Sequence, residues 1–156
     1  TPLPASYATH MLEHYYDPFH KSLNKQIMYL YNIFGFCYHI DLHTMPSKAL
    51  LNFKKEPDIV LGDNFWKSCS IGLPNYFQNV FKENSFTVEL NNPYAGGFIT
   101  RNYGNPSKGV HTIQIEINRK IYMDENKLSL KNIKILQEIF AKIFNNLKLS
   151  EKIAAE

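Results

Sequence analysis

Histidine and carboxylate side chains alternate in the segment His39-Ile40-Asp41-Leu42-His43. On a strand, residues 39, 41 and 43 share one face, because successive side chains point to opposite sides. Imidazole and carboxylate groups on a common face can bind zinc together, or the carboxylate can orient an imidazole that binds it. Alternatively, His39 and Asp41 are satisfied polar groups near a sheet edge. His43 is the strongest candidate ligand, since it follows the predicted strand directly.

Glu116 is the second candidate, because it lies in a segment where isoleucine occupies every second position, at 113, 115 and 117. This alternation predicts one buried face and an opposite face that carries Glu116. A carboxylate in a half-enclosed crevice loses solvation, which raises its pKa toward the working range of a general base. An ion pair with Arg119 or with a lysine explains the residue equally well.

Arginine is rare in this chain, which makes its two examples worth attention. Of 17 basic residues, only Arg101 and Arg119 are arginines. A guanidinium group holds a carboxylate through two parallel hydrogen bonds, which lysine cannot do. Each arginine can therefore clamp an acidic substrate or stabilise an oxyanion, or can form a surface ion pair.

The remaining polar candidates carry weaker signals. His10 and His14 are spaced to bridge a metal on a helix, but a solvated helix face explains them as well. His20 and His111 are expected to be structural or to position substrate. Asn92 lies in an Asn-Asn-Pro-Tyr segment that could aim an amide at a substrate, although formation of a turn alone accounts for it.

Helices and strands alternate along the chain, which predicts an α/β sheet with helices on its faces. Asp17 is expected to cap a helix that ends at Gly35, and Ser129 to cap the last helix. The stretch 91–104, rich in proline and glycine, is expected to be a loop. The helices are predicted over residues 7–16, 18–34, 73–82 and after 129, and the strands over 36–42, 58–61, 86–90 and 110–117.

The polar candidates follow the predicted strands directly. In open α/β sheets, ligands bind beyond the carboxyl ends of the strands. We therefore expect one crevice formed by His43, Asp63, the pair at 91–92 and the segment 116–119, with a polar loop over 43–48.

Composition limits the class of protein. The chain has 156 residues, 44% apolar and 20% charged, which is typical of one globular domain. A net charge of +3 with scattered bases does not predict a nucleic-acid or membrane partner. Cys37 and Cys69 do not make a disulfide framework and indicate a reducing compartment, the cytoplasm. Phosphate loops, dinucleotide fingerprints and nucleophile elbows are missing from the sequence.

Several motifs resemble those of a known family. Residues 41–47 (Asp-Leu-His-Thr-Met-Pro-Ser) are similar to its Asp-x-His-Ser-Met-Pro block. Residues 92–104 are similar to its Asn-x-Pro…Gly-Gly…Thr-Arg-x-Tyr-Gly block, and 111–119 to its Gln-x-Glu-x-x-Arg block. Residues 16–20 and 58–63 also match, in the same order. The family is the N-formylglutamate amidohydrolases.

The resemblance implies a zinc hydrolase of the carboxypeptidase-like superfamily, an α/β phosphorylase/hydrolase-like fold with a mixed sheet flanked by helices. The implied reaction converts N-formyl-L-glutamate and water to formate and glutamate, in histidine degradation. The expected roles are Glu116 as general base, His43 as zinc ligand, Asp41 as the group that orients it, and Arg101, Arg119, Asn92, Gly97 and His20 as substrate-binding residues.

One zinc ion is expected, with its other ligands, a histidine and an acidic residue, upstream of this chain. Residues 1–156 are then a single domain, the C-terminal part of such an enzyme, as Thr1 also suggests. Its partners would be a small acylated amino acid and either the missing half or a second copy. The alternatives are a zinc deacylase or peptidase with another substrate and an inactive binding module.

Overall fold

The computed structural model describes residues 4–50 and 56–147. Thr1, on which one expectation rested, lies outside them. The described residues divide into two compact units, one ending at Cys37 and one beginning at Tyr38. That residues 1–156 form a single domain stays a prediction. Within the described ranges, no helix combines the length and apolar character needed to cross a membrane.

The described part of the first unit is helical from Ala5 to Phe34. Helix α1 (Ala5–Met11) passes into a π-helical turn (Leu12–Tyr16) and then into α2 (Asp17–Phe34). The prediction that Asp17 caps a new helix is wrong, because Tyr16 before it is already helical and no side-chain cap bond forms. The wider π-helical turn accommodates the ring of Pro18, which would otherwise crowd the preceding turn. The predicted end is confirmed: Gly35 is left-handed (φ 76°), and its N–H donates to the carbonyl of Tyr31.

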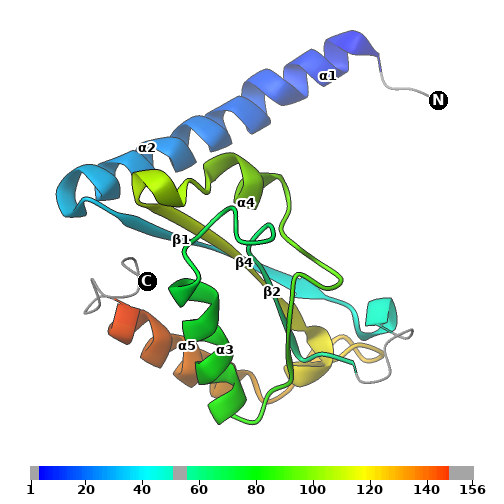
Figure 1. Cartoon of the computed structure of the whole chain (residues 1–156). Coiled ribbons are helices and arrows are strands. Elements are labelled where there is room, and N and C mark those ends of the chain that lie inside the picture. The colour runs from blue at the N-terminus through cyan, green and yellow to red at the C-terminus, as the bar shows by residue number, and fades with distance from the viewer. Residues whose placement is uncertain (1–3, 51–55, 148–156) are drawn as a thin grey trace. The chain divides into compact units, whose positions relative to one another are not determined.

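A four-stranded mixed sheet organises the second unit (Figure 1). The strands are β1 (Cys37–Met45), β2 (Ile59–Gly62), β3 (Val88–Leu90) and β4 (Val110–Asn118), in the order β1-β4-β2-β3. β2 is parallel to β3 and antiparallel to β4. The predicted mixed sheet is confirmed.

Helices cover the sheet. α3 (Gly72–Glu83) and α5 (Ile133–Leu147) lie on one side, and α4 (Phe98–Tyr103) lies on the other (Figure 1). The isoleucines of β4 face α3 and α5, in one core cluster with Ile59 and Leu61 of β2. The predicted alternation along β4 is therefore correct. All nine residues of β4 are nevertheless buried, because its polar face is covered as well.

The expectation of one crevice at the carboxyl ends of all strands is wrong. β2 and β4 run in opposite directions, with Val60 opposite Glu116 and Gly62 opposite Gln114. Asp63, which follows β2, therefore lies at the end of the sheet where β4 begins. There its N–H and Oδ1 bind the side chain of Asn91.

His43 lies inside β1 instead of following it, so the polar loop predicted from residue 43 begins later. The strand continues to Met45, which is 1% exposed and packs with Val60 and Tyr94. Burial of Met45 extends the strand past the polar residues. His43 consequently lies on the sheet, level with Glu116, and not beyond it.

Two further predictions are corrected. Ser129 does not cap the last helix, because it pairs in a two-stranded sheet formed by β5 (Met123–Asp124) and β6 (Ser129–Leu130). α5 (Ile133–Leu147) begins after Asn132, which has a positive φ of 53°. The expected loop at 91–104 contains the short helix α4.

Candidate active site on strands β1 and β4

Two strands bring His43 and Glu116 together. The Nδ1 atom of His43 lies 4.0 Å from Oε1 of Glu116, and its Nε2 atom lies 3.0 Å from Oδ1 of Asp41. Asp41 precedes His43 by two residues on the same face of β1, so the strand geometry places the carboxylate against the ring. Asp41 thus fixes the imidazole with Nδ1 directed at Glu116.

Burial sets the chemistry of Glu116. Its side chain is 10% exposed, whereas that of His43 is 46% exposed. Burial raises the pKa of Glu116, and the neighbouring His43, Gln114 and Arg119 only partly offset this rise. A carboxylate with a raised pKa beside an accessible imidazole can accept a proton from water, as a general base must.

A glutamine holds the carboxylate of Glu116 from the other side. Gln114 donates from Nε2 to Oε1 of Glu116 (2.9 Å) and accepts at Oε1 from the N–H of Gly97 (2.7 Å). Gln114 was not among the predicted site residues. The sequence did contain a signal for it, since the alternation of β4 puts Gln114 on the same face as Glu116.

The two arginines occupy different places. Arg119 follows β4, and its Nε donates to Oγ1 of Thr44 in β1 (3.3 Å). Its positive charge also acts on Glu116, whose pKa it lowers. Arg101 lies exposed on α4, where Nη1 donates to the carbonyl of Gly96 (3.3 Å). The structure therefore brings Arg119 to the His43–Glu116 pair and puts Arg101 on the helix that follows Gly97.

The sequence profile described as N-formylglutamate amidohydrolase matches residues 1–123, which include Asp41, His43, Gly97, Gln114 and Glu116. The chain belongs to the N-formylglutamate amidohydrolase family.

Named relatives agree with this family. The chain is 34% identical over 118 residues to the N-formylglutamate deformylase of Pseudomonas putida, covering 74% of this chain and 44% of that protein. It is 32% identical over 112 residues to the N-formylglutamate deformylase of Pseudomonas aeruginosa strain PAO1, covering 70% of this chain and 42% of that protein. The chain thus spans less than half the length of these curated relatives.

A solved member of the family has the same fold. The N-formylglutamate amidohydrolase from Ralstonia eutropha JMP134 superposes with a TM-score of 0.82 at 29% identity, over 88% of this chain and 51% of that one. The mixed α/β architecture predicted for the family is therefore that of this chain.

A metal of the kind expected for the family needs more donors than this site supplies. A catalytic zinc ion takes three protein ligands and an open position. In the ranges 4–50 and 56–147, no group of three or more His, Cys, Asp or Glu side chains is arranged to hold a metal ion. His43 with its neighbouring carboxylates does not fit a complete zinc site by itself.

Two further residues, Asn92 and His20, were predicted to bind substrate. Asn92 is exposed and precedes the cis Asn92–Pro93 peptide bond. His20 belongs to the first unit, where its ring packs 4.1 Å from that of Tyr16. Their roles in substrate binding stay predictions.

Three further histidines are structural or solvated. His111 is 2% exposed, and its Nδ1 accepts from the N–H of Ser70 (3.0 Å). Burial lowers the pKa of His111, which keeps the ring neutral and suited to accept this bond. His10 and His14 are both exposed on the first helical unit, as their alternative interpretation had it.

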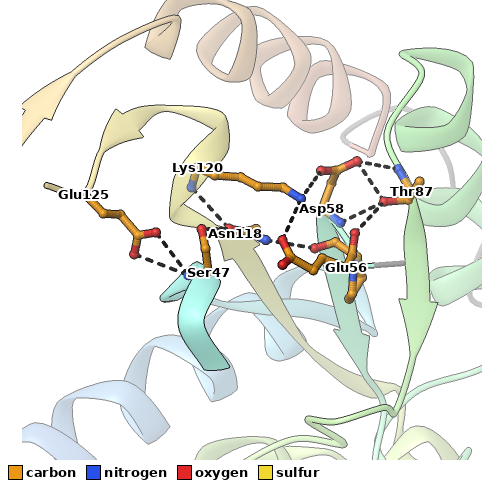
Figure 2. Close-up of polar contacts among 8 residues, drawn as sticks. Ser47, Glu56, Asp58, Thr87, Asn118, Lys120 and Glu125 are labelled. Carbon is orange, nitrogen blue, oxygen red and sulfur yellow. Dashed lines mark hydrogen bonds and ion pairs between the residues drawn. The ribbon is translucent and has the colours of Figure 1, made fainter. Parts of the chain in front are cut away.

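A second polar cluster, which we call the end cluster, joins the ends of β1 and β4 to the starts of β2 and β3 (Figure 2). Its centre is Asn118, which is fully buried, accepts from Oγ of Ser47 (2.9 Å) and donates to the carbonyl of Pro57 (3.1 Å). Nζ of Lys120 lies 3.2 Å from Glu56 and 3.7 Å from Asp58. The end cluster therefore fixes the strand ends beside which His43 and Glu116 lie.

Proposed function

We propose that the protein containing this chain hydrolyses the formyl amide of N-formyl-L-glutamate to formate and glutamate. The observation that carries the proposal is the buried carboxylate of Glu116, held 4.0 Å from an imidazole that Asp41 orients. The family of the chain and its relatives named N-formylglutamate deformylase support the choice of substrate. Because the chain spans less than half of those relatives, the activity is proposed for the whole protein.

In this proposal Glu116 takes a proton from the attacking water, and the water oxygen bonds to the formyl carbon. The carbon becomes tetrahedral, and the positive charge of Arg119 stabilises the negative oxygen that results. Glu116 then passes the proton to the amine nitrogen as the carbon–nitrogen bond breaks. Arg101 binds a carboxylate of the glutamate through paired hydrogen bonds.

Zinc remains part of the proposal through His43 alone. Asp41 holds Nε2 of His43, so Nδ1 is the atom available to a metal. When bound, zinc would supply acidity to the water and charge for the oxyanion. The remaining donors must come from outside the described residues. Metal analysis of the full translated protein and of its His43→Ala variant tests this, and equal zinc content in both would remove His43 from the metal site.

The proposal also assigns a place in the cell and in metabolism. Cys37 and Cys69 are free and buried, which suits a reducing compartment such as the cytoplasm. Burial raises the pKa of Cys69 to about 12, so its thiol stays protonated and unreactive. The reaction would be a step of histidine degradation, the pathway that the family resemblance implies for N-formyl-L-glutamate.

The substrate is tested by comparing amides that differ only in the acyl group. We expect the full translated protein to release formate from N-formyl-L-glutamate with a much higher kcat/KM than it releases acetate or succinate from the acetyl or succinyl analogues. A preference for another acyl group would make the protein a related deacylase. No turnover of any of these amides would favour a binding module.

A further inference from the structure

We propose that Gln114 is a positioning residue that couples the loop 94–97 to the carboxylate of Glu116. The inference rests on the proposed function, in which Glu116 is the general base. Gln114 is 5% exposed and spans the two groups, since its amide accepts from Gly97 at one end and donates to Glu116 at the other.

The orientation of the Gln114 amide follows from the Gly97 N–H. A backbone N–H can only donate, so the atom that faces Gly97 must be the amide oxygen. The amide nitrogen is then directed at Glu116, 2.9 Å away. A side chain held at both ends has lost its rotamer freedom, so the carboxylate of Glu116 meets a donor at a fixed position.

A glycine on the neighbouring strand allows the loop to reach Gln114. Gly62 lies opposite Gln114 in the register of β2 and β4. A Cβ atom on Gly62 would lie 2.6 Å from the backbone nitrogen of Gly96 and 2.7 Å from the carbonyl carbon of Ala95. The loop therefore lies directly on the backbone of Gly62. A further hydrogen bond, from the N–H of Asn64 to the carbonyl of Ala95 (2.7 Å), holds the loop in this position.

The same loop leads into the helix that carries Arg101. α4 begins directly after Gly97, and the N–H of Arg101 donates to the carbonyl of Gly97 (3.2 Å). Through Gly97, Gln114 thus links the start of this helix to Glu116. Together with the contact on Gly62 and the Asn64–Ala95 hydrogen bond, Gln114 thus helps to set the position of this helix relative to Glu116. This suits an acylated amino acid whose carboxylate and scissile amide are a fixed distance apart.

Two substitutions separate the two ends of Gln114, and both are assayed in the full translated protein. Gln114→Glu keeps an oxygen that accepts from the Gly97 N–H, but it puts a carboxylate oxygen in place of the amide nitrogen that donates to Glu116. The kcat should therefore fall on the order of 10- to 100-fold with little change in KM. Gln114→Met fills the same space without polar atoms and should lower kcat by a similar factor while KM also rises. Thr112→Val, a buried polar position on the same face of β4, is the matched control and should leave kcat and KM unchanged.

A double-variant comparison distinguishes positioning from loss of structure. If Gln114 acts through Glu116, adding Gln114→Met to Glu116→Gln should not reduce the residual kcat further. An equal reduction in both backgrounds, or a normal kcat for Gln114→Glu, would overturn the inference. If Glu116→Gln alone keeps parental turnover, the base assignment fails first, and the proposed function fails with it.

The hydrogen bond from the Gly97 N–H to Gln114 can be tested by a measurement that does not depend on activity. Hydrogen exchange of the Gly97 amide should be at least about tenfold faster in Gln114→Met and unchanged in Thr112→Val, because only the first removes its acceptor. Unchanged exchange in Gln114→Met would show that Gln114 does not hold the loop. That result would overturn the inference even where Glu116→Gln is inactive.

Discussion

Two polar clusters lie on the same strand, only two residues apart, and they are built differently. In the end cluster, Asn118 is fully buried with partners for both ends of its amide, and the carboxylate of Asp58 accepts from N and Oγ1 of Thr87. In the other cluster, Glu116 accepts one hydrogen bond from the described residues, donated by Gln114, and the imidazole of His43 lies 4.0 Å away.

The difference indicates what each cluster does. A buried polar group with its partners in place stabilises one arrangement of the chain. A buried carboxylate with few partners carries a cost, and such costs are common where a group must react. The end cluster therefore acts as scaffold for the strands, and the contrast supports the proposal that Glu116 is the reacting group.

The largest effect expected is on turnover. Glu116→Gln keeps the shape and the acceptor for Gln114 but cannot take a proton, so kcat should fall by roughly two or more decades. Formate release measures this loss, and circular dichroism of the same sample checks that the variant is folded. If Glu116→Gln in the full translated protein keeps the turnover of the parent, Glu116 is not the general base, and the two clusters do not differ in the way proposed.

The next largest effect is expected on stability. Asn118→Ala leaves Oγ of Ser47, the N–H of Lys120 and the carbonyl of Pro57 without their partner, which should cost about 2–4 kcal/mol of unfolding free energy. Urea denaturation measures the loss.

The control for Asn118→Ala is Asn79→Ala, at an exposed position of α3, which should change stability by less than about 0.5 kcal/mol. In Asn118→Ala, the kcat per folded molecule should remain within a few-fold of that of the parent. A stable Asn118→Ala protein with abolished turnover would reverse the assignment and make the end cluster part of the reaction.

A smaller effect is expected at the edge of the site. Arg101→Lys keeps the charge but loses the paired hydrogen bonds of guanidinium, so kcat/KM for N-formyl-L-glutamate should fall about tenfold, mainly through KM. Steady-state kinetics on the full translated protein measure this. If kcat/KM is unchanged, Arg101 does not contact the substrate.

The sequence predicts the local part of the fold well and the pairing of strands poorly. Local signals find three features: the alternation of isoleucine predicts β4, Pro74 marks the start of α3, and Gly35 marks the end of α2. The direction of β4 relative to β2 depends on how the intervening segments lead the chain back to the sheet, and no local signal carries that information. For this reason the crevice expected at one end of all strands, with Asp63 beside Glu116, was wrong.

The candidate site divides in the same way. The alternation of residues 39–43 and 110–117 predicts the face on which His43, Asp41 and Glu116 lie. The hydrogen bond from Gly97 to Gln114 could not be predicted, because it depends on the backbone of residues 94–97 resting on Gly62, far away in sequence. Where two backbone segments approach each other this closely, the only trace in the sequence is a glycine at the point of contact.

The raised pKa of Glu116 also predicts a pH-dependent effect on stability. Burial raises the pKa of Glu116, so the folded protein holds this proton at pH values where the unfolded chain has lost it. At low pH the Glu116 side chain is protonated and does not reduce the free energy of unfolding. As the pH rises through its raised pKa, the side chain becomes charged while still buried, and this stability is lost. Glu116→Gln removes this cost, and its melting temperature should exceed that of the parent at pH 7–8.

The advantage of Glu116→Gln should shrink as the pH approaches 4, where the parent side chain is protonated too. Thermal unfolding across this range measures the trend. The matched control is Glu89→Gln, at an exposed position of β3, which should show no such pH-dependent gain. A Glu116→Gln protein that melts below the parent at pH 7–8 would mean that Glu116 stabilises the fold, as the groups of the end cluster do.

The smallest effect is expected at the exposed side of the end cluster. The side chains of Lys120 and Glu56 are 39% and 32% exposed, so water and salt screen their 3.2 Å ion pair. Lys120→Met should therefore cost less than about 1 kcal/mol in urea denaturation, and raising NaCl to about 1 M should reduce the difference from the parent. A loss as large as that of Asn118→Ala would mean that the ion pairs, and not the buried amide, hold the strand ends together.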